Sequence, residues 1–123
     1  MNKFFFFLTL AVCGVSLALK AAPVLSETSA RDYLKNGALV IDVRTAAEFK
    51  TKHLTNVVNI PLAELKAKLP AQIADKRTVV LLHCQSGQRS GQAQAQLQAM
   101  GYTNAFNLGS FEPARKIVTP VTP

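Results

Sequence analysis

Apolar runs of strand length recur along the chain, separated by polar or amphipathic segments. The runs lie at residues 38–43, 56–60, 77–84 and 104–108. The runs at 38–43 and 77–84 each contain four consecutive apolar residues, and short runs of this kind are typical of strands that are buried on both faces. The run at 77–84 is the most apolar, so we expect it at the centre of the sheet. Segments of helical character separate the runs, which predicts an α/β fold: a mainly parallel sheet with helices on both faces.

Helix start and stop signals flank the first apolar run. Residues 26–37 predict a short helix, with Ser29 as a candidate N-cap and Gly37 as its stop. After the run, Thr45 is a candidate N-cap for a second short helix, and Glu48 stands at the reciprocal position of a capping box. We therefore expect one helix on each side of the first strand.

Three later segments also have helical character. Leucines at helical spacing predict a helix over 62–69, which Pro70 is expected to close. Residues 91–101 alternate as a strand would, but their Ala, Gln, Leu and Met are helix formers, which favours a helix beginning near Ser90. Residues 112–118 predict one more helical turn.

The first residues have the composition of a secretory leader. An uncharged apolar run at 4–19 follows Lys3, and small residues come after it. A basic start, an apolar stretch and a small-residue exit are typical of a signal peptide, here with a cut near Ala18 or shortly after. We therefore expect residues 1–22 to be a signal peptide and the protein to be periplasmic.

Two alternatives to a cleaved leader are open. One is an uncleaved membrane anchor, although a spanning helix needs roughly 18 to 20 apolar residues and the run is shorter. The other is lipidation of Cys13, although Val12 is large where a small residue is usual. With a cleaved leader, residues 23–115 form one domain and 116–123 a C-terminal tail.

Charge bears on the partners. The formal net charge is +7, which favours small anions or acidic partners. The lysines are scattered and lack interleaved aromatic residues, so we expect no nucleic-acid binding. We expect no metal and no cofactor, because His53, His83 and one thiol fall on separate elements and both histidines suit structural roles. Once the leader is removed, we expect no stable membrane insertion.

Cysteine content narrows the chemistry further. The chain has 2 cysteines, and removal of the leader leaves Cys84 without a disulfide partner. An unpaired thiol in an oxidising compartment is either buried and inert or used in chemistry. Cys84 stands at the carboxyl end of the expected central strand, where ligands bind in α/β sheets, and this position favours its use.

The loop after Cys84 has the features of an anion-binding cradle. Residues 85–89 connect the strand to a helix near Ser90, so their backbone N–H groups can turn toward the sulfur and favour the thiolate. Gly87 permits the required backbone conformation, and Arg89 adds a fixed positive charge. These features predict a nucleophilic sulfur that is ionised near neutral pH and open to solvent.

Three separated motifs carry a resemblance to a known family. The segment HCQSGQRS at 83–90 resembles the active-site loop of the rhodaneses. The segment VIDVRTAAEFKTKHLTNVVNIP at 40–61 resembles their upstream signature, and GYTNAFNLGSFEPA at 101–114 resembles their closing strand and turn. With its leader, the chain is most similar to the small periplasmic rhodaneses of the phage-shock type. The resemblance implies a five-stranded sheet and sulfur transfer through a cysteine persulfide.

The resemblance also implies roles for individual residues. Cys84 matches the catalytic nucleophile that forms the persulfide. The positions that match the substrate-binding loop are Gln85, Ser86, Gly87, Gln88 and Arg89. Asp42 and Arg44 match a signature pair that gives structural support to the loops at the strand ends. Lys52 departs from the family, many of whose members have glycine before the histidine, and this departure bears on substrate access.

The function that the resemblance implies is that of a thiosulfate sulfurtransferase. Thiosulfate, a small anionic donor, would give its outer sulfur to Cys84, and the persulfide would pass this sulfur to cyanide or to a thiol. One alternative is a persulfide carrier or binding module with little turnover. Another is a cysteine phosphatase or arsenate reductase. The loop from Cys84 to Arg89 is shorter than the phosphatase loop it resembles, and it has no acid for a leaving group.

Overall fold

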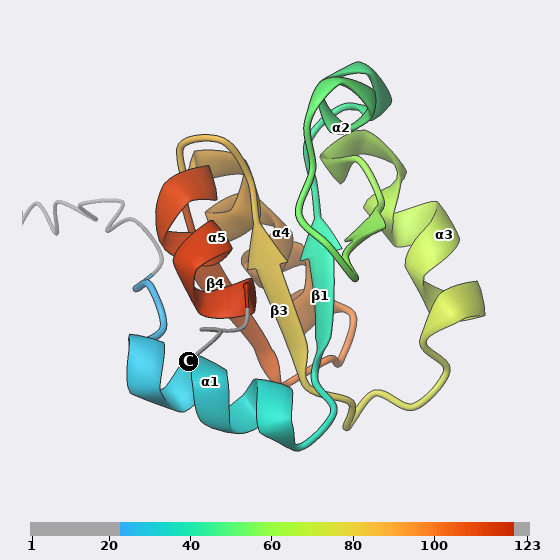
Figure 1. The fold of residues 1–123 in the computed structure, drawn as a ribbon. Helices are drawn as coiled ribbons and strands as arrows, with labels where there is room; N and C mark the ends of the chain where they lie inside the picture. The colour runs from blue at the N-terminus through green and yellow to red at the C-terminus, as the bar shows by residue number, and fades with distance from the viewer. Residues whose placement is uncertain (1–22, 120–123) are drawn as a thin grey trace, which may run out of the picture.

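The computed structural model describes residues 23–119 (Figure 1). The expected signal peptide, residues 1–22, lies outside the described residues, and so does the end of the expected tail, residues 120–123. No helix within the described range is long and apolar enough to cross a bilayer. Strands and helices alternate along this range, as the apolar runs predict.

The sheet consists of 4 parallel strands in the order β2-β1-β3-β4. The strands are β1 Leu39–Asp42, β2 Val58–Asn59, β3 Val80–His83 and β4 Ala105–Gly109. Strands β1, β2 and β3 lie within predicted runs, and β4 extends one residue past its run, to Gly109. Strand β3 lies between β1 and β4 and is buried along its length, so its central position is confirmed. The register pairs Asp42 with His83, which puts the carboxyl ends of β1 and β3 side by side.

The prediction of a fifth strand is wrong for the described part of the chain. At the edge of the sheet beside β4, Val24 makes only an isolated parallel bridge to Asn107. The Leu25 N–H donates to the Asn107 carbonyl at 2.8 Å. Ser26 is already the N-cap of α1, so the chain turns into a helix before a second pairing can form.

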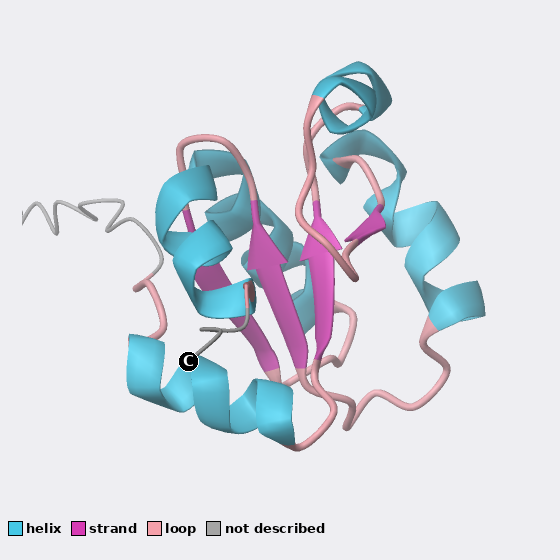
Figure 2. Ribbon diagram, in the orientation of Figure 1, coloured by secondary structure: helices cyan, strands magenta, loops and turns pink. Residues whose placement is uncertain are grey.

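Helices cover both faces of the sheet (Figures 1 and 2). They are α1 Glu27–Lys35, α2 Ala46–Thr51, α3 Leu65–Gln72, α4 Gln88–Ala99 and α5 Phe111–Val118, with a short 3-10 helix η1 at Leu62–Glu64. On one face, Ala30 of α1 packs in a buried cluster with Leu81 of β3 and residues of α5. On the other face, Leu69 of α3 and Leu97 of α4 pack with Leu82 of β3. This two-sided packing confirms the α/β prediction.

The capping signals of the sequence are confirmed at α2 and wrong at α1. The Thr45 hydroxyl accepts from the Glu48 N–H at 3.2 Å, and the Glu48 carboxylate accepts from the Thr45 N–H at 3.3 Å. At α1 the N-cap is Ser26 rather than Ser29, and the Ser29 N–H donates to the Ser26 hydroxyl at 3.3 Å. Ser26 has the extended backbone that an N-cap needs, whereas Ser29 already lies inside the helix.

Several helices extend beyond their predicted ends. Pro70 lies inside α3 rather than closing it. The buried Leu69 and Ile73 hold the last turn although proline lacks an N–H, and the Ile73 N–H donates to the Leu69 carbonyl at 2.8 Å. Helix α4 begins at Gln88, before Ser90, and α5 is a full helix rather than a single turn.

Candidate active site

The carboxyl ends of β1, β3 and β4 lie at one edge of the sheet, where α2, α4 and α5 follow them (Figure 1). Cys84 comes directly after β3 at this edge. Its backbone N–H donates to the Gly109 carbonyl at 3.2 Å, and the Phe111 N–H donates to the Gln85 carbonyl at 3.2 Å. These bonds hold the loop after Cys84 against the turn between β4 and α5.

Gly87 gives the loop its curvature. Its φ of 91° is in the left-handed region, which favours glycine, and it is the N-cap residue of α4. A Cβ at this position would lie 3.4 Å from the Gly109 backbone, in ordinary contact, so the requirement for glycine comes from the backbone angle. With this conformation, the Gly87 N–H points at the Cys84 sulfur, 3.0 Å away.

The surroundings of the Cys84 sulfur favour the thiolate. The Ser90 hydroxyl lies 3.4 Å from the sulfur, which the Gly87 N–H also contacts. Burial by itself raises the pKa of the Cys84 thiol. Hydrogen bonds from the Ser90 hydroxyl and from the backbone N–H groups of Ser90, Gly87 and Ser86 lower this pKa and outweigh burial. The thiol therefore ionises at a lower pH than an ordinary cysteine.

The prediction of a solvent-open thiol is wrong. Cys84 is 0% exposed and packs in the apolar cluster that also contains Leu82 and Ala93. The buried Ser90 and the Gly109 main chain close around it. A donor can therefore reach the sulfur only after side chains around the loop have moved.

Arg89 directs its guanidinium at Glu48 of α2. Its Nη1 and Nη2 donate to the two carboxylate oxygens at 2.7 and 3.0 Å. These hydrogen bonds lower the pKa of Glu48 to about 2, so this carboxylate is ionised at neutral pH. Arg89 is thus paired within the chain, and its contact with a substrate stays a prediction.

Asp42 and Arg44 form an ion pair that is 0% and 3% exposed, respectively. The shortest contact joins Arg44 Nη2 and Asp42 Oδ2 at 2.7 Å. Arg44 Nη1 donates to the Gln85 side-chain oxygen at 3.4 Å, and Nη2 also donates to the Lys52 carbonyl at 2.6 Å. The pair therefore connects the end of β1 with the Cys84 loop and with the end of α2.

The structure brings all the predicted site residues together at the carboxyl ends of the strands. Gln85 and Ser86 are exposed on the loop, Gln88 is exposed at the start of α4, and Gly87 and Arg89 are partly buried. The loop is thus tied down by main-chain bonds and ion pairs, while the side chains of Gln85 and Ser86 face solvent.

Comparison with known proteins identifies the family. A family model described as a rhodanese-like domain matches residues 26–113. The chain belongs to the rhodanese family. One relative, the thiosulfate sulfurtransferase PspE of Escherichia coli, is 38% identical over 72 residues, which cover 58% of this chain and 69% of that protein.

Solved rhodanese structures have the same fold. A structure of a rhodanese with anions from E. coli is similar with a TM-score of 0.60 at 35% identity, over 63% of this chain and 91% of that one. The human single-domain sulfurtransferase TSTD1 is similar with a TM-score of 0.64 at 28% identity, over 77% of this chain and 96% of that one. Both matches cover nearly the whole of the other protein's chain.

The histidines of this rhodanese make structural contacts. His83 is buried, and burial lowers its pKa more than the Asp42 carboxylate raises it, so its ring is neutral at neutral pH. His53 stacks on Phe49 with ring centroids 4.1 Å apart, and its Nδ1 lies 2.8 Å from the Phe49 carbonyl oxygen. Among residues 23–119, no group of three His, Cys, Asp or Glu is placed to hold a metal ion.

Two residues that touch the Cys84 loop were given no role there from the sequence. Ser90 ends the segment that resembles the active-site loop but is interpreted only as a helix start, and Glu48 only as part of a capping box. The position of Ser90 in the first turn of a helix is a usable signal, because helical side chains point back toward the preceding turn. No local pattern pairs Glu48 with Arg89, which is 41 residues away.

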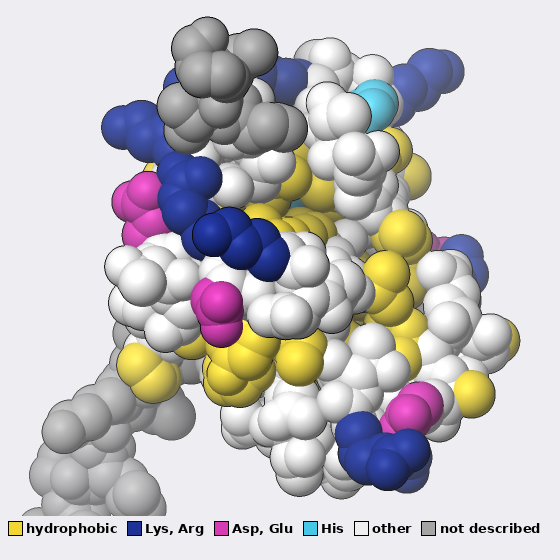
Figure 3. Space-filling model, turned by 60° about the horizontal axis from the view of Figure 1, so that its bottom comes forward, with side chains coloured by type: hydrophobic (Ala, Val, Ile, Leu, Met, Phe, Trp, Pro, Cys, Tyr) yellow, Lys and Arg dark blue, Asp and Glu magenta, His cyan; other side chains and the backbone are white. Residues whose placement is uncertain are grey.

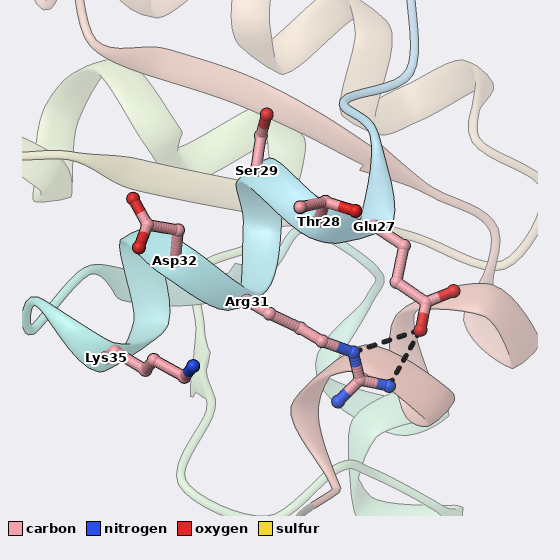
Figure 4. Close-up of a pocket in the computed structure, with 6 residues that line it drawn as sticks. All are labelled: Glu27, Thr28, Ser29, Arg31, Asp32 and Lys35. Atoms are coloured by element: carbon pink, nitrogen blue, oxygen red, sulfur yellow. Dashed lines mark hydrogen bonds and ion pairs between the residues drawn. The ribbon is translucent and has the colours of Figure 1, made fainter.

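Figure 4 shows a pocket on α1, and this helix lies at the end of the fold away from the carboxyl ends of the strands (Figure 1). The residues that line the pocket are Glu27, Thr28, Ser29, Arg31, Asp32 and Lys35. They come from one helix and carry charges of both signs, and Arg31 is paired with Glu27 at 2.9 Å. Figure 3 shows basic and acidic side chains next to each other on this lower face. The candidate site is therefore the Cys84 loop.

Proposed function

We propose that this protein is a thiosulfate sulfurtransferase that carries sulfur as a persulfide of Cys84. The observation that carries the proposal is the Gly87 N–H, which donates to the sulfur at 3.0 Å, together with the Ser90 hydroxyl, which lies 3.4 Å from the sulfur. Such donors favour the thiolate, which is the nucleophilic form of cysteine. Membership of the rhodanese family and the thiosulfate sulfurtransferase among its relatives support the same function.

The proposed reaction consists of two displacements. The Cys84 thiolate attacks the outer sulfur of thiosulfate, the S–S bond of thiosulfate breaks, and its electron pair leaves with sulfite. Cys84 then holds an anionic persulfide. Cyanide or an acceptor thiolate attacks the terminal sulfur and leaves as thiocyanate or as the acceptor persulfide, which restores the Cys84 thiolate. Charge and electrons balance in both steps without a cofactor.

The loop supplies the binding groups in this proposal. The Gly87 N–H already donates to the sulfur at 3.0 Å, and the Ser86 N–H also stabilises the thiolate. Arg89 closes the loop through its bond to α2, and the Asp42–Arg44 pair supports the loop through Gln85. In this proposal the loop N–H groups stabilise the charge of the sulfur, and the two ion pairs hold the loop in position.

The burial of Cys84 favours a second candidate, a persulfide carrier with little turnover. The residue is 0% exposed, so both loading and release of sulfur require side chains to move. A protected persulfide would be transferred slowly and would survive longer. The two candidates differ in whether the protein completes many cycles or one.

Mass spectrometry after exposure of the full chain to thiosulfate tests the proposal. We expect the peptide with Cys84 to gain one sulfur atom and the peptide with Cys13 to gain none. A Cys84→Ser variant should gain no sulfur at this site. Cyanide should then release thiocyanate, in many cycles for a sulfurtransferase and in one equivalent for a carrier. A Cys84 peptide that never gains sulfur would refute both candidates.

We also propose that the protein is exported to the periplasm through residues 1–22. The apolar run after Lys3 and the small residues near Ala18 support this location. Cell fractionation and N-terminal sequencing of the recovered protein test it. We expect periplasmic protein that begins shortly after Ala18, and a chain that keeps its first residues would contradict a cleaved leader.

A further inference from the structure

Three cationic side chains lie around the Cys84 loop, and two of them, Arg44 and Arg89, form close ion pairs with carboxylates. Arg44 is buried against Asp42, with a shortest contact of 2.7 Å. Arg89 binds both oxygens of Glu48 at 2.7 and 3.0 Å. Because each carboxylate offsets the positive charge of its arginine, either guanidinium attracts an incoming anion less strongly than an unpaired cation would.

Two separate sets of contacts connect the third cation, Lys52, with the same loop. Its carbonyl accepts from Arg44 Nη2 at 2.6 Å, and Nη1 of that arginine donates to the Gln85 side chain at 3.4 Å. Its ammonium lies 4.8 Å from the centre of the Phe111 ring, and the Phe111 N–H donates to the Gln85 carbonyl at 3.2 Å. Both sets of contacts include Gln85, the residue next to Cys84.

Lys52 is also the least neutralised of the three cations. Its nearest carboxylate is that of Glu112, at 3.8 Å, which is longer than either arginine contact. The second oxygen of Glu112 accepts from Arg115 at 2.8 Å, so two cations share this carboxylate. The Lys52 side chain is 64% exposed, which leaves its charge available to anions in solution. The face of an aromatic ring further favours a cation at this position.

We propose that Lys52, rather than Arg89, is the cation that recruits small anionic sulfur donors to Cys84. The identity of the donor rests on the proposed function, but the recruitment of anions to this thiol does not. A positive charge near a reactive group raises the local concentration of anions and the rate at which they arrive. Lys52 thus determines how strongly the site prefers anionic reagents over neutral ones.

Alkylation of Cys84 by two matched reagents measures this effect. Iodoacetate is anionic and iodoacetamide is neutral, and each forms a C–S bond to the thiolate with loss of iodide. The measured quantity is the ratio of the two rates at Cys84 in the full chain, located by peptide mass spectrometry. Because both reagents meet the same thiolate behind the same side chains, the ratio cancels effects on pKa and burial.

The test variant is Lys52→Met, which keeps the chain in contact with Phe111 and removes the charge. We expect the ratio to fall about threefold to tenfold, and less at high salt, because added ions screen the lost attraction. Lys52→Arg should keep the wild-type ratio. The matched control is Lys76→Met, since the Lys76 ammonium also lies over a ring, 6.0 Å from the centre of Tyr102, before the amino end of β3.

A ratio unchanged by Lys52→Met would overturn the inference, as would an equal fall in Lys76→Met or a wild-type Cys84 that iodoacetate does not modify. With thiosulfate as the reagent, Lys52→Met should raise KM by a similar factor and leave kcat nearly unchanged. A Cys84 that gains no sulfur from thiosulfate, but still shows the Lys52-dependent ratio, would refute the proposed function and leave this inference standing.

Discussion

The Ser90 hydroxyl lies 3.4 Å from the Cys84 sulfur, and its one proton can go to this sulfur, to the Gly87 carbonyl oxygen at 3.1 Å or to the Gly109 carbonyl oxygen at 3.5 Å. Ser90 and Cys84 are both 0% exposed. Ser90 belongs to the first turn of α4, so the helix that follows the loop supplies a hydroxyl to the sulfur at the start of the loop. A buried thiolate has no water to solvate it, and this hydroxyl replaces part of that solvation.

Replacing Ser90 with alanine should raise the pKa of the Cys84 thiol. The substitution removes a hydrogen bond to the thiolate and leaves the burial that disfavours it. Thiolate absorbance in the ultraviolet, followed against pH, measures the shift. Ser86→Ala is the control, because Ser86 acts through its backbone N–H, which alanine keeps. Equal titration curves for the two variants would show that the Ser90 hydroxyl has no part in ionisation.

Replacing Gly87 with alanine should cost stability and also disturb the thiol. The φ of 91° is strained for alanine, at about 1 to 2 kcal/mol in the free energy of unfolding. Gly37→Ala is the matched control, because its φ is 86° and nothing lies within 4 Å of the added Cβ. Urea unfolding should show a similar loss in both variants. Only Gly87→Ala should slow the alkylation of Cys84, and an equal effect of Gly37→Ala would contradict this role of the loop.

The strands and the capping box were predictable because their signals are local. The run that contains β3 has four consecutive aliphatic residues at 79–82, and all of that strand is buried. Thr45 and Glu48 are close in sequence, so the capping box follows from spacing alone. The N-cap of α1 was misplaced because Ser26 and Ser29 have the same capping side chain, and only the backbone angle distinguishes them.

Contacts between distant segments were not predictable from the sequence. The partner of Arg89 is 41 residues away, so nothing beside Arg89 in the chain indicates that its guanidinium is occupied. The complete burial of Cys84 depends on how α4 and the turn after β4 pack around the loop. The missing fifth strand depends on where α1 begins, which is a competition between the edge of the sheet and a helix cap.

Replacing Glu48 with glutamine should make stability less dependent on pH in acid. The pKa of Glu48 is about 2 in the folded protein against an ordinary value of 4.5, so its ionised form stabilises the fold above pH 4.5. That stabilisation is lost as the pH falls from 4.5 toward 2. The Arg89 and Glu48 side chains are 32% and 34% exposed. We therefore expect their ion pair to contribute about 1 kcal/mol to the free energy of unfolding at neutral pH.

Urea unfolding of the wild type and Glu48→Gln at neutral pH and in acid measures this difference. The difference in free energy of unfolding between the two proteins should be smaller in acid than at neutral pH. Glu64→Gln is the control, because Glu64 makes an exposed ion pair with Lys68 within one helical segment, worth about 0.5 kcal/mol or less. A constant gap at all pH values would mean that the ion pair with Arg89 does not contribute to stability.

Replacing Asp42 with asparagine should destabilise the protein more than any of these changes. Asparagine keeps the shape of the side chain but leaves the Arg44 guanidinium buried without its counter-charge, which costs about 3 to 5 kcal/mol. Urea unfolding measures the loss. Asp75→Asn, which removes the partner of the exposed Arg77, should stay close to the wild type. If the two variants were equally stable, the buried pair could not be what holds the end of β1 to the Cys84 loop. A second variant, Asp42→Asn with Arg44→Met, removes both charges and should recover part of the loss, because no unpaired charge then remains buried.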